Sequence, residues 1–354
     1  MRVSISYVQR AHLREYEKAY VPMFSDELRR YGRDADLVIE EDPAKADIVI
    51  LWEGFEYKGP EYIRILENDP LIRAHAERVY TVNYDDHPEG LLAGVYTSLE
   101  GTLFNSALHR IWPFFLMNNP RVYDLTSEDV IPLNPKFLFS FTGAASHEVR
   151  KRLFSLYASP SPKYYVEHVR KWYNHGDDDR LKFAQVALNS VFCLCPHGFC
   201  AYTPRITEVM AMARVPVIIA DDWIPVSFEE SVPYYIKVAE KDIEHLGDIL
   251  SLRLADAEEY RLNARMLWEK YCSPSRRASA VVRCIANLAK HVGNRMSYDD
   301  YRDIWNSKAF LKQLGWTPAQ RIALRIEQHA RRLHPAIKVP GVTPLMRYRN
   351  AAFR

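Results

Sequence analysis

Two apolar runs on either side of a loop and a helical segment constrain the fold of this chain more than any other feature. The first run, Val191 to Cys195, is long enough for a buried parallel strand, and Pro196 and Gly198 end it. The second run, Val215 to Ala220, is rich in β-branched residues and also predicts a buried strand. The pattern therefore predicts a strand–loop–helix–strand unit, and such units bind ligands at the carboxyl ends of their strands.

The helix between these strands carries the residues best suited to a ligand. Thr203 and Pro204 are expected as its N-cap and its first residue. Arg205 and Glu208 follow three residues apart, so both side chains project from one face of the first turn. An arginine beside a helix N-terminus favours an anion, and this predicts a pocket for the phosphates of a nucleotide.

Both charged residues of this helix have a functional and a structural interpretation. We expect Arg205 to clamp a diphosphate and to stabilise the charge that builds on a leaving nucleotide. We expect Glu208 to accept hydrogen bonds from both ribose hydroxyls through its two oxygens. The structural alternative is a surface ion pair between the two side chains.

The loop before the helix supplies three further candidates. His197 is expected to contact phosphate or an acceptor, with a plain loop histidine as the alternative. Gly198 is expected to let the backbone approach the nucleotide closely, or to take a positive φ in a turn. Thr203 is expected to combine its capping role with a phosphate contact.

Two other predicted strand ends add four candidates. The segment FSFTG predicts a strand that ends at Gly143, and the following helix presents Arg150 as a second phosphate contact. A solvated basic helix face is the alternative for that arginine. Asp221 and Asp222 follow the second apolar run, and we expect them to hydrogen-bond sugar hydroxyls or to form a turn.

The order of these motifs resembles that of the exostosin-like glycosyltransferases. The resemblance rests on FCLCPHG, the Arg205–Glu208 helix, VPVII at 215–219, the Asp221–Asp222 turn and FLFSFTGAASHEVRKRLF at 137–154. It implies an inverting enzyme of the GT-B type, in which two α/β domains face a cleft. Its donor would be a nucleotide sugar, UDP-linked, and its acceptor a glycan. Where the family usually has arginine this chain has His197, which weakens one phosphate contact.

The chain resembles a bacterial, cytoplasmic form of that family, because it begins directly on a strand-like segment with no apolar region typical of a secretory signal. This implies a role in surface polysaccharide synthesis, with a glycan or lipid-linked glycan as acceptor. Two alternatives are a fucosyltransferase-like enzyme that uses a GDP-sugar and a non-catalytic nucleotide- or glycan-binding subunit of a synthesis complex.

Length and hydrophobic periodicity predict two doubly wound α/β domains. At 354 residues the chain exceeds what one hydrophobic core usually covers. Strands expected at Arg2–Val8, Ala46–Trp52 and Arg78–Val82 alternate with helices, so the N-terminal half also predicts a parallel sheet. We expect an acceptor-side domain at 1–135, a nucleotide-sugar-binding domain at 136–290, and helices with a basic tail at 291–354.

Direct transfer of a sugar needs a base that takes the proton from the acceptor hydroxyl. In a two-domain cleft this base is expected from the first domain. Asp85 and Asp86, in the NYDDHPEG segment, follow one predicted strand, and Glu53 follows another. Each of these carboxylates also fits a loop or capping role.

A metal site is the less favoured interpretation of two other motifs. Cys193, Cys195, His197 and Cys200 have a spacing that a zinc ion accepts, but the first two lie in an apolar strand where free cysteine behaves as a small hydrophobe. Asp177 to Asp179 precede a helix and suit its N-terminus. We therefore expect no metal ion and no cofactor.

Charge is unevenly distributed along the chain. From residue 321 onward eight Lys/Arg face only Glu327, and because the net charge is +2 the first 320 residues carry about −5. This balance predicts no nucleic-acid partner. The predicted helix Pro318–Leu333 within the basic tail is expected either to lie on an anionic membrane surface or to pack on the protein body.

Overall fold

The computed structural model of the protein describes residues 1–8, 18–32, 36–54, 59–113, 119–130, 134–169, 176–291, 296–315 and 317–319, with 322 and 326. The predicted helix at 318–333 and the basic tail therefore lie almost entirely outside the described residues. No helix of the described part is long and apolar enough to cross a membrane.

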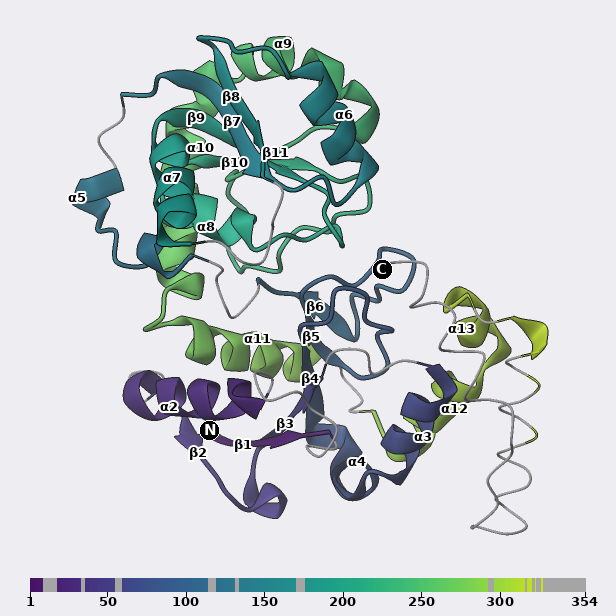
Figure 1. The fold of residues 1–354 in the computed structure, drawn as a ribbon. Coiled ribbons are helices and arrows are strands. Elements are labelled where there is room, and N and C mark those ends of the chain that lie inside the picture. Colours follow the sequence, from purple (N-terminus) through teal and green to yellow (C-terminus); the bar gives the residue numbers. More distant parts are fainter. Residues whose placement is uncertain are drawn as a thin grey trace.

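Two parallel sheets form the framework of the molecule (Figure 1). The first has the order β2-β1-β3-β4-β5-β6, and every neighbouring pair in it is parallel. Its strands are β1 (Arg2–Tyr7), β2 (Val38–Ile39), β3 (Ile48–Glu53), β4 (Val79–Asn83), β5 (Gly94–Tyr96) and β6 (His109–Ile111). The helices around it are α2 (Tyr20–Tyr31), α3 (Gly59–Asn68) and α4 (Pro70–His75).

The second sheet has the order β11-β10-β9-β7-β8 and is also parallel throughout. Its strands are β7 (Phe137–Gly143), β8 (Tyr164–His168), β9 (Ser190–Pro196), β10 (Val215–Ile219) and β11 (Ile236–Lys237). Its helices are α6 (Glu148–Leu156), α7 (Asp177–Leu188), α8 (Arg205–Ala211), α9 (Leu246–Ser251) and α10 (Ala257–Leu267). The short α5 (Ser127–Val130) lies between the two sheets in sequence.

Both sheets are doubly wound, which confirms the predicted fold class. In each, the chain adds one strand on one side of the first strand and then crosses to the other side, between β1 and β3 and between β7 and β9. Ligands in such sheets bind outside the carboxyl ends of the strands at this switch point. The two switch points are therefore the places where a site is expected.

Apolar residues cover both faces of the second sheet. Phe192 and Leu194 of β9 face a core cluster with residues of α6 and α9, whereas Cys193 and Cys195 face the cluster that includes α8 and α10. This alternation follows from the two-residue period of a strand. It explains why the strand reads as a continuous apolar run.

The C-terminal helices return to the first sheet. After a π-helical turn (Trp268–Cys272), α11 (Arg277–His291) packs against α2 and β5 and lies between the two sheets (Figure 1). The helix α12 (Tyr298–Asn306) follows, and then α13 (Lys308–Gln313). The Tyr301 hydroxyl accepts a hydrogen bond from the Ala93 amide at 3.1 Å, and the Trp305 indole donates one to the Leu91 carbonyl at 2.7 Å. These contacts tie the end of the described chain to its N-terminal half.

Candidate functional site

Arg150 braces the loop that follows β9. Its Nε donates a hydrogen bond to the His197 carbonyl at 2.9 Å, and its Nη2 donates one to the Pro196 carbonyl at 3.1 Å. The residue is only 8% exposed, so the alternative of a solvated basic helix face is wrong. Burial, and then the nearby Arg205 cation, lower the pKa of the Arg150 guanidinium to about 9.

Gly198 provides the space for that guanidinium. A Cβ at this position would lie 2.7 Å from Nη2 of Arg150, which is closer than any ordinary contact. Gly198 does not adopt a positive φ, so the predicted alternative of a turn with positive φ at this residue is wrong. The physical reason for glycine here is the close approach of the arginine side chain.

Arg205 lies between two aromatic rings at the end of β7. Its Cζ is 4.7 Å from the ring centroid of Phe141 and 5.5 Å from that of Phe183. Its Nη2 donates a hydrogen bond to the Thr142 carbonyl at 2.6 Å. The buried Nε has no hydrogen-bond partner within the described part of the chain. Burial lowers the pKa of this guanidinium.

Gly143 is the corresponding close-approach glycine at the other strand end. A Cβ there would lie 2.9 Å from Cζ of Phe141 and 3.4 Å from Nη2 of Arg205. Gly198 thus makes room for Arg150 at the end of β9, and Gly143 makes room for the Phe141 ring at the end of β7. These strand ends flank the switch point of the second sheet.

The helix α8 differs in detail from the sequence prediction. It begins at Arg205 with Pro204 as the preceding residue, and no side chain caps it, so the predicted N-cap role of Thr203 is wrong. Glu208, in its first turn, is 5% exposed, which excludes a solvated surface residue.

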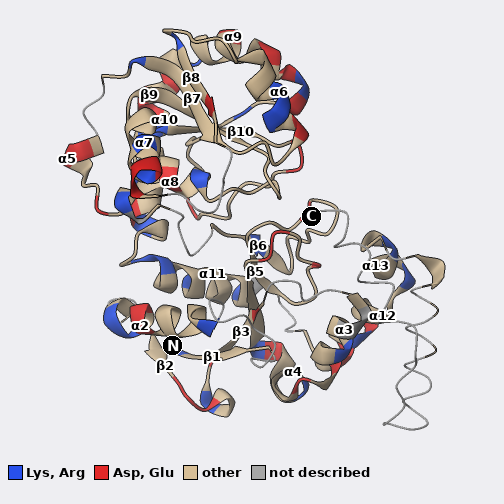
Figure 2. Ribbon diagram, in the orientation of Figure 1, with Lys and Arg blue, Asp and Glu red and all other residues tan. Residues whose placement is uncertain are grey.

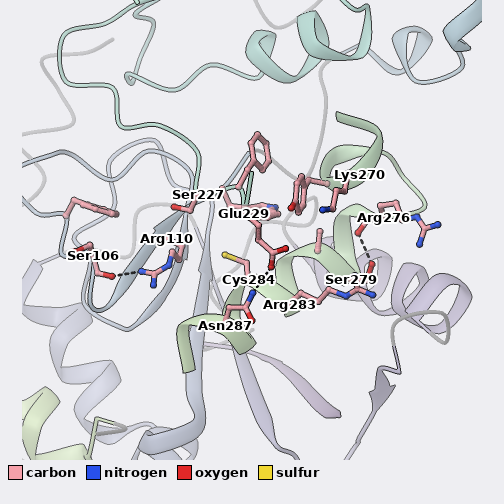
Figure 3. Close-up of a pocket in the computed structure, with 15 residues that line it drawn as sticks. Ser106, Arg110, Ser227, Glu229, Lys270, Arg276, Ser279, Arg283, Cys284 and Asn287 are labelled. Atoms are coloured by element: carbon pink, nitrogen blue, oxygen red, sulfur yellow. Dashed lines mark hydrogen bonds between the residues drawn. The ribbon is translucent and has the colours of Figure 1, made fainter. Parts of the chain in front are cut away.

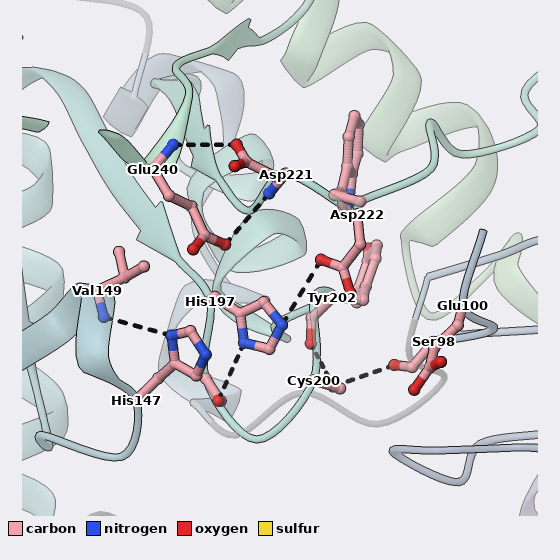
Figure 4. Close-up of polar contacts among 12 residues, drawn as sticks. Ser98, Glu100, His147, Val149, His197, Cys200, Tyr202, Asp221, Asp222 and Glu240 are labelled. Atoms are coloured by element: carbon pink, nitrogen blue, oxygen red, sulfur yellow. Dashed lines mark hydrogen bonds and ion pairs between the residues drawn. The ribbon is translucent and has the colours of Figure 1, made fainter. Parts of the chain in front are cut away.

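A pair of histidines joins the start of α6 to the loop after β9 (Figure 4). The rings of His147 and His197 stack with centroids 4.0 Å apart and an interplanar angle of 22°. His147 Nδ1 accepts a hydrogen bond from the Val149 amide at 3.3 Å at the start of α6. His197 Nε2 lies 3.6 Å from Oδ1 of Asp222. We refer to Arg150, Arg205, His147 and His197 as the arginine–histidine cluster.

The two aspartates after β10 have different partners. Asp222 faces His197, as described above. Asp221 accepts a hydrogen bond from the Glu240 amide at 3.0 Å, and its own amide donates to Oε1 of Glu240 at 3.2 Å (Figure 4). Asp221 thus links the end of β10 to Glu240, 19 residues later in the chain.

Asp86, which follows β4 of the first sheet, contacts the loop after β9. Its Oδ1 is 3.5 Å from the thiol of Cys200, which also accepts a hydrogen bond from the Ser98 hydroxyl at 3.1 Å. Asp86 is partly exposed and follows the end of β4. The structure thus places one predicted carboxylate from the N-terminal half against the loop that carries His197.

The other two predicted bases are more enclosed. Glu53, at the end of β3, is 4% exposed and accepts hydrogen bonds from the hydroxyls of Tyr62 and Thr81. Burial raises the pKa of this carboxyl. Asp85 is 6% exposed, and its Oδ1 accepts a hydrogen bond from the His87 amide at 2.8 Å.

The cysteines of this region are buried thiols. Burial raises the pKa of Cys193 to about 11 and also raises the pKa of Cys195 and Cys200. Among the described residues, no group of three His, Cys, Asp or Glu side chains is arranged to hold a metal ion. Asp177 lies in the first turn of α7 and pairs with Arg121 at 3.3 Å.

Sequence reasoning missed His147 and Phe141. Histidine is an uncommon helix cap, and Phe141 looks like any core residue of a strand. Only the packing of α6 against the loop after β9 shows that the first stacks on His197 and the second lies under both arginines.

Comparison with known proteins supports the family resemblance. Residues 89–251 match the family model of the Exostosin GT47 domain. A probable glucuronoxylan glucuronosyltransferase IRX7 of Arabidopsis thaliana is 40% identical over 104 residues, which are 25% of this chain and 23% of that protein. The Exostosin-1 homolog of Caenorhabditis elegans is 28% identical over 149 residues, 38% of each chain. The chain thus spans well under half the length of these relatives.

Solved structures share low identity with this chain. Anabaena Alr3699/HepE in complex with UDP and glucose has a TM-score of 0.40 at 10% identity, covering 83% of this chain and 99% of that one. An alpha1,3-fucosyltransferase with GDP-fucose has a TM-score of 0.40 at 13% identity, covering 84% and 92%. Residues 89–251 of this chain carry the sequence pattern of the exostosin GT47 domain, the family that the motifs at 191–228 also indicate.

Proposed function

We propose that this protein is a glycosyltransferase of the GT-B type that transfers a sugar from a nucleotide-sugar donor to a glycan. The observation that carries the proposal is the position of Arg150 and Arg205, whose Cζ atoms lie 5.6 and 4.7 Å from the ring centroid of Phe141. Their hydrogen bonds go to main-chain carbonyls. A diphosphate supplies the negative charge that two such cations require.

The arginine–histidine cluster also supports the orientation of the donor. The cluster lies at the switch point between β7 and β9, and Glu208 lies within the adjoining helix α8. In this arrangement the diphosphate contacts the arginines and the ribose reaches Glu208. We propose UDP as the nucleotide, and inversion at the anomeric carbon through direct attack by the acceptor.

Asp86 is the proposed general base. It is partly exposed and touches the loop of the second domain through Cys200, whereas Glu53 and Asp85 are buried among hydrogen-bond donors. A base on this side of the cleft takes the proton of the acceptor hydroxyl while the arginines stabilise the leaving diphosphate. The mechanism uses these side chains without a metal ion.

The proposed acceptor is a glycan or lipid-linked glycan in the synthesis of a bacterial surface polysaccharide, on the cytoplasmic side of the membrane. The support is the match of residues 89–251 to the exostosin GT47 domain, together with similar proteins that are named for the transfer of sugars. The basic tail offers a membrane contact in this proposal.

A thermal-shift panel of UDP, GDP, CMP and ADP tests the donor site. A nucleotide at a hundredfold excess over its dissociation constant stabilises the native protein by about 2.7 kcal/mol. We expect UDP to raise the Tm of the wild type and of Arg253→Gln, a control on the surface, and to leave Arg205→Gln unchanged. Stabilisation by GDP in place of UDP would favour the fucosyltransferase-like alternative. Stabilisation by no nucleotide would contradict the proposal and favour a glycan-binding subunit.

A further inference from the structure

One cavity of the described structure is lined by residues outside the arginine–histidine cluster (Figure 3). Its volume is about 400 Å³, and it shares no lining residue with the loop at 196–205. Segments far apart in sequence meet there: Arg110 of β6, Ser227 to Glu229 after β10, and one face of α11. The Ser227 hydroxyl accepts a hydrogen bond from the Ile111 amide at 3.0 Å, which joins the two halves of the molecule at the cavity.

Three aromatic side chains form one wall of this cavity. Trp112 meets Phe228 edge-on at 5.7 Å and Tyr271 edge-on at 5.8 Å, and the rings of Phe228 and Tyr271 stack at 4.9 Å. Pockets for small molecules are lined in this way, by aromatic surface with a few polar groups. A sugar ring presents a flat face of C–H groups that packs against such aromatic surface.

Basic side chains from both halves of the molecule surround the aromatic wall. Arg110 lines one side, and Arg276, directly before α11, and Arg283 of α11 line the other (Figure 3). Figure 2 shows basic positions in blue along α11. Within the described part of the chain, neither Arg276 nor Arg283 makes an ion pair. Glu229 is held by Asn287, whose Nδ2 donates to its Oε1 at 2.7 Å. The cations therefore outnumber the carboxylates at this cavity.

Two arginines line the cavity at and beside α11. Arg276 directly precedes the first residue of this helix, and its carbonyl accepts a hydrogen bond from the Ala280 amide at 2.9 Å, whereas Arg283 lies within the helix. The small residues Ser279 and Ala280 also line the cavity. Guanidinium groups form bidentate contacts with carboxylates.

A backbone irregularity positions the remaining wall. The Ser273 amide donates to the Trp268 carbonyl at 2.9 Å, a five-residue step that makes the turn Trp268–Cys272 a π-helix. This turn carries Lys270 and Tyr271 into the lining of the cavity. Such π-helical turns are uncommon and occur frequently at functional sites.

We propose that this cavity binds an acidic saccharide, one whose sugar rings carry carboxylates. The rings pack on Trp112, Phe228 and Tyr271, and the carboxylates pair with Arg276 and Arg283. The site is separate from the proposed nucleotide site, so its occupancy requires no donor. Because its lining comes from both sheets, a bound saccharide contacts both halves of the molecule.

Isothermal titration calorimetry on the whole chain, without nucleotide, tests the proposal. The probes are an α-1,4-linked tetragalacturonate, the neutral maltotetraose and inorganic phosphate. We expect tetragalacturonate to bind at least tenfold more tightly than either other probe. The variant Arg276→Ala/Arg283→Ala should weaken its binding at least tenfold. The charge-matched control Arg29→Ala/Arg302→Ala, on exposed faces of α2 and α12, should leave its affinity unchanged.

A second variant, Phe228→Leu, tests the aromatic wall with little loss of volume at a half-buried position. It should weaken tetragalacturonate binding and leave phosphate binding unchanged. Equal affinity for phosphate and saccharide would overturn the proposal, as would no binding of tetragalacturonate or full affinity in the Arg276→Ala/Arg283→Ala variant. None of these results depends on the UDP thermal shift. The proposal for this cavity and the proposal for the nucleotide site are therefore tested independently.

Discussion

His147 and His197 stack face to face, with ring centroids 4.0 Å apart, and their surroundings shift the pKa values of the two imidazoles in opposite directions. Burial, and then the neighbouring His197, lower the pKa of His147. Burial also acts to lower the pKa of His197, but the hydrogen bond to Asp222 and the Gly198 carbonyl outweigh it and raise that pKa. The pair therefore takes up its first proton on His197.

The pair of His197 and Asp222 predicts a pH-dependent stability. The raised pKa of His197 means that its contribution is complete below the ordinary value of 6.5 and is lost as the pH rises through the folded-state pKa. The pKa of Asp222 is lowered by the hydrogen bond to His197, so its contribution is present above 3.8 and is lost on acidification. Asp222→Asn should lower the free energy of unfolding by up to about 1 kcal/mol at pH 5.5 and by less at pH 9.

Urea denaturation at the two pH values measures this difference. Glu244→Gln is the matched control, because His245 and Glu244 form an exposed pair at 3.4 Å. Its effect should be small and equal at both pH values. A loss in Asp222→Asn that does not change with pH would show that the carboxylate acts through the turn and not through the imidazolium.

Gly198→Ala should disrupt the brace that Arg150 makes. The added Cβ would come within 2.7 Å of Nη2, so the guanidinium must leave the carbonyls of Pro196 and His197. We expect a loss of about 1–3 kcal/mol in the free energy of unfolding, together with weaker UDP binding. Gly247→Ala is the control, because a Cβ there meets nothing within 4 Å and α9 gains a better helix former. Unchanged stability and binding in Gly198→Ala would contradict the brace.

Arg277 and Glu27 form a buried bridge between α11 and α2. The Arg277 Nε lies 3.1 and 3.0 Å from the two carboxylate oxygens, and the side chains are 11% and 14% exposed. Glu27→Ala leaves a buried cation and should cost about 3–5 kcal/mol in the free energy of unfolding. The double variant Glu27→Leu/Arg277→Met should recover most of that loss.

The exposed pair of Arg29 and Asp26, on the same helix α2, is the control for this prediction. Asp26→Ala should change the free energy of unfolding by less than about 1 kcal/mol, because water screens the pair. Denaturant unfolding of the three variants measures the contrast. Equal losses in Glu27→Ala and Asp26→Ala would show that the bridge contributes no more than a surface contact.

Asp86→Asn should separate donor binding from turnover. If Asp86 is the base, the variant keeps the UDP thermal shift and loses about 10²–10⁴-fold in kcat. Asp85→Asn should stay within a few-fold of the wild type, because its side-chain oxygen still accepts the His87 amide. Steady-state rates with a UDP-sugar and a glycan acceptor measure both. A large loss of kcat in Asp85→Asn, with nearly unchanged kcat in Asp86→Asn, would assign the base to Asp85.

Local pattern was sufficient to predict the framework of this protein. The run of apolar residues from 191 to 195 became β9, and that from 215 to 220 became β10, within one residue at most ends. A strand buried on both faces needs apolar residues at every position, so its signal lies in adjacent residues. The fold class and the strand ends that bear candidate residues follow from the same short-range signals.

Long-range packing decided the roles inside that framework. Gly198 faces Arg150, 48 residues earlier in the chain, and Asp86 meets Cys200 across more than a hundred residues. The cavity beside α11 draws its wall from Trp112, Phe228 and Tyr271, which no motif links. Such contacts depend on how helices and sheets dock, and docking depends on the shapes of many side chains together. A pattern read along the chain carries the period of each element but not which side chains meet when the elements pack.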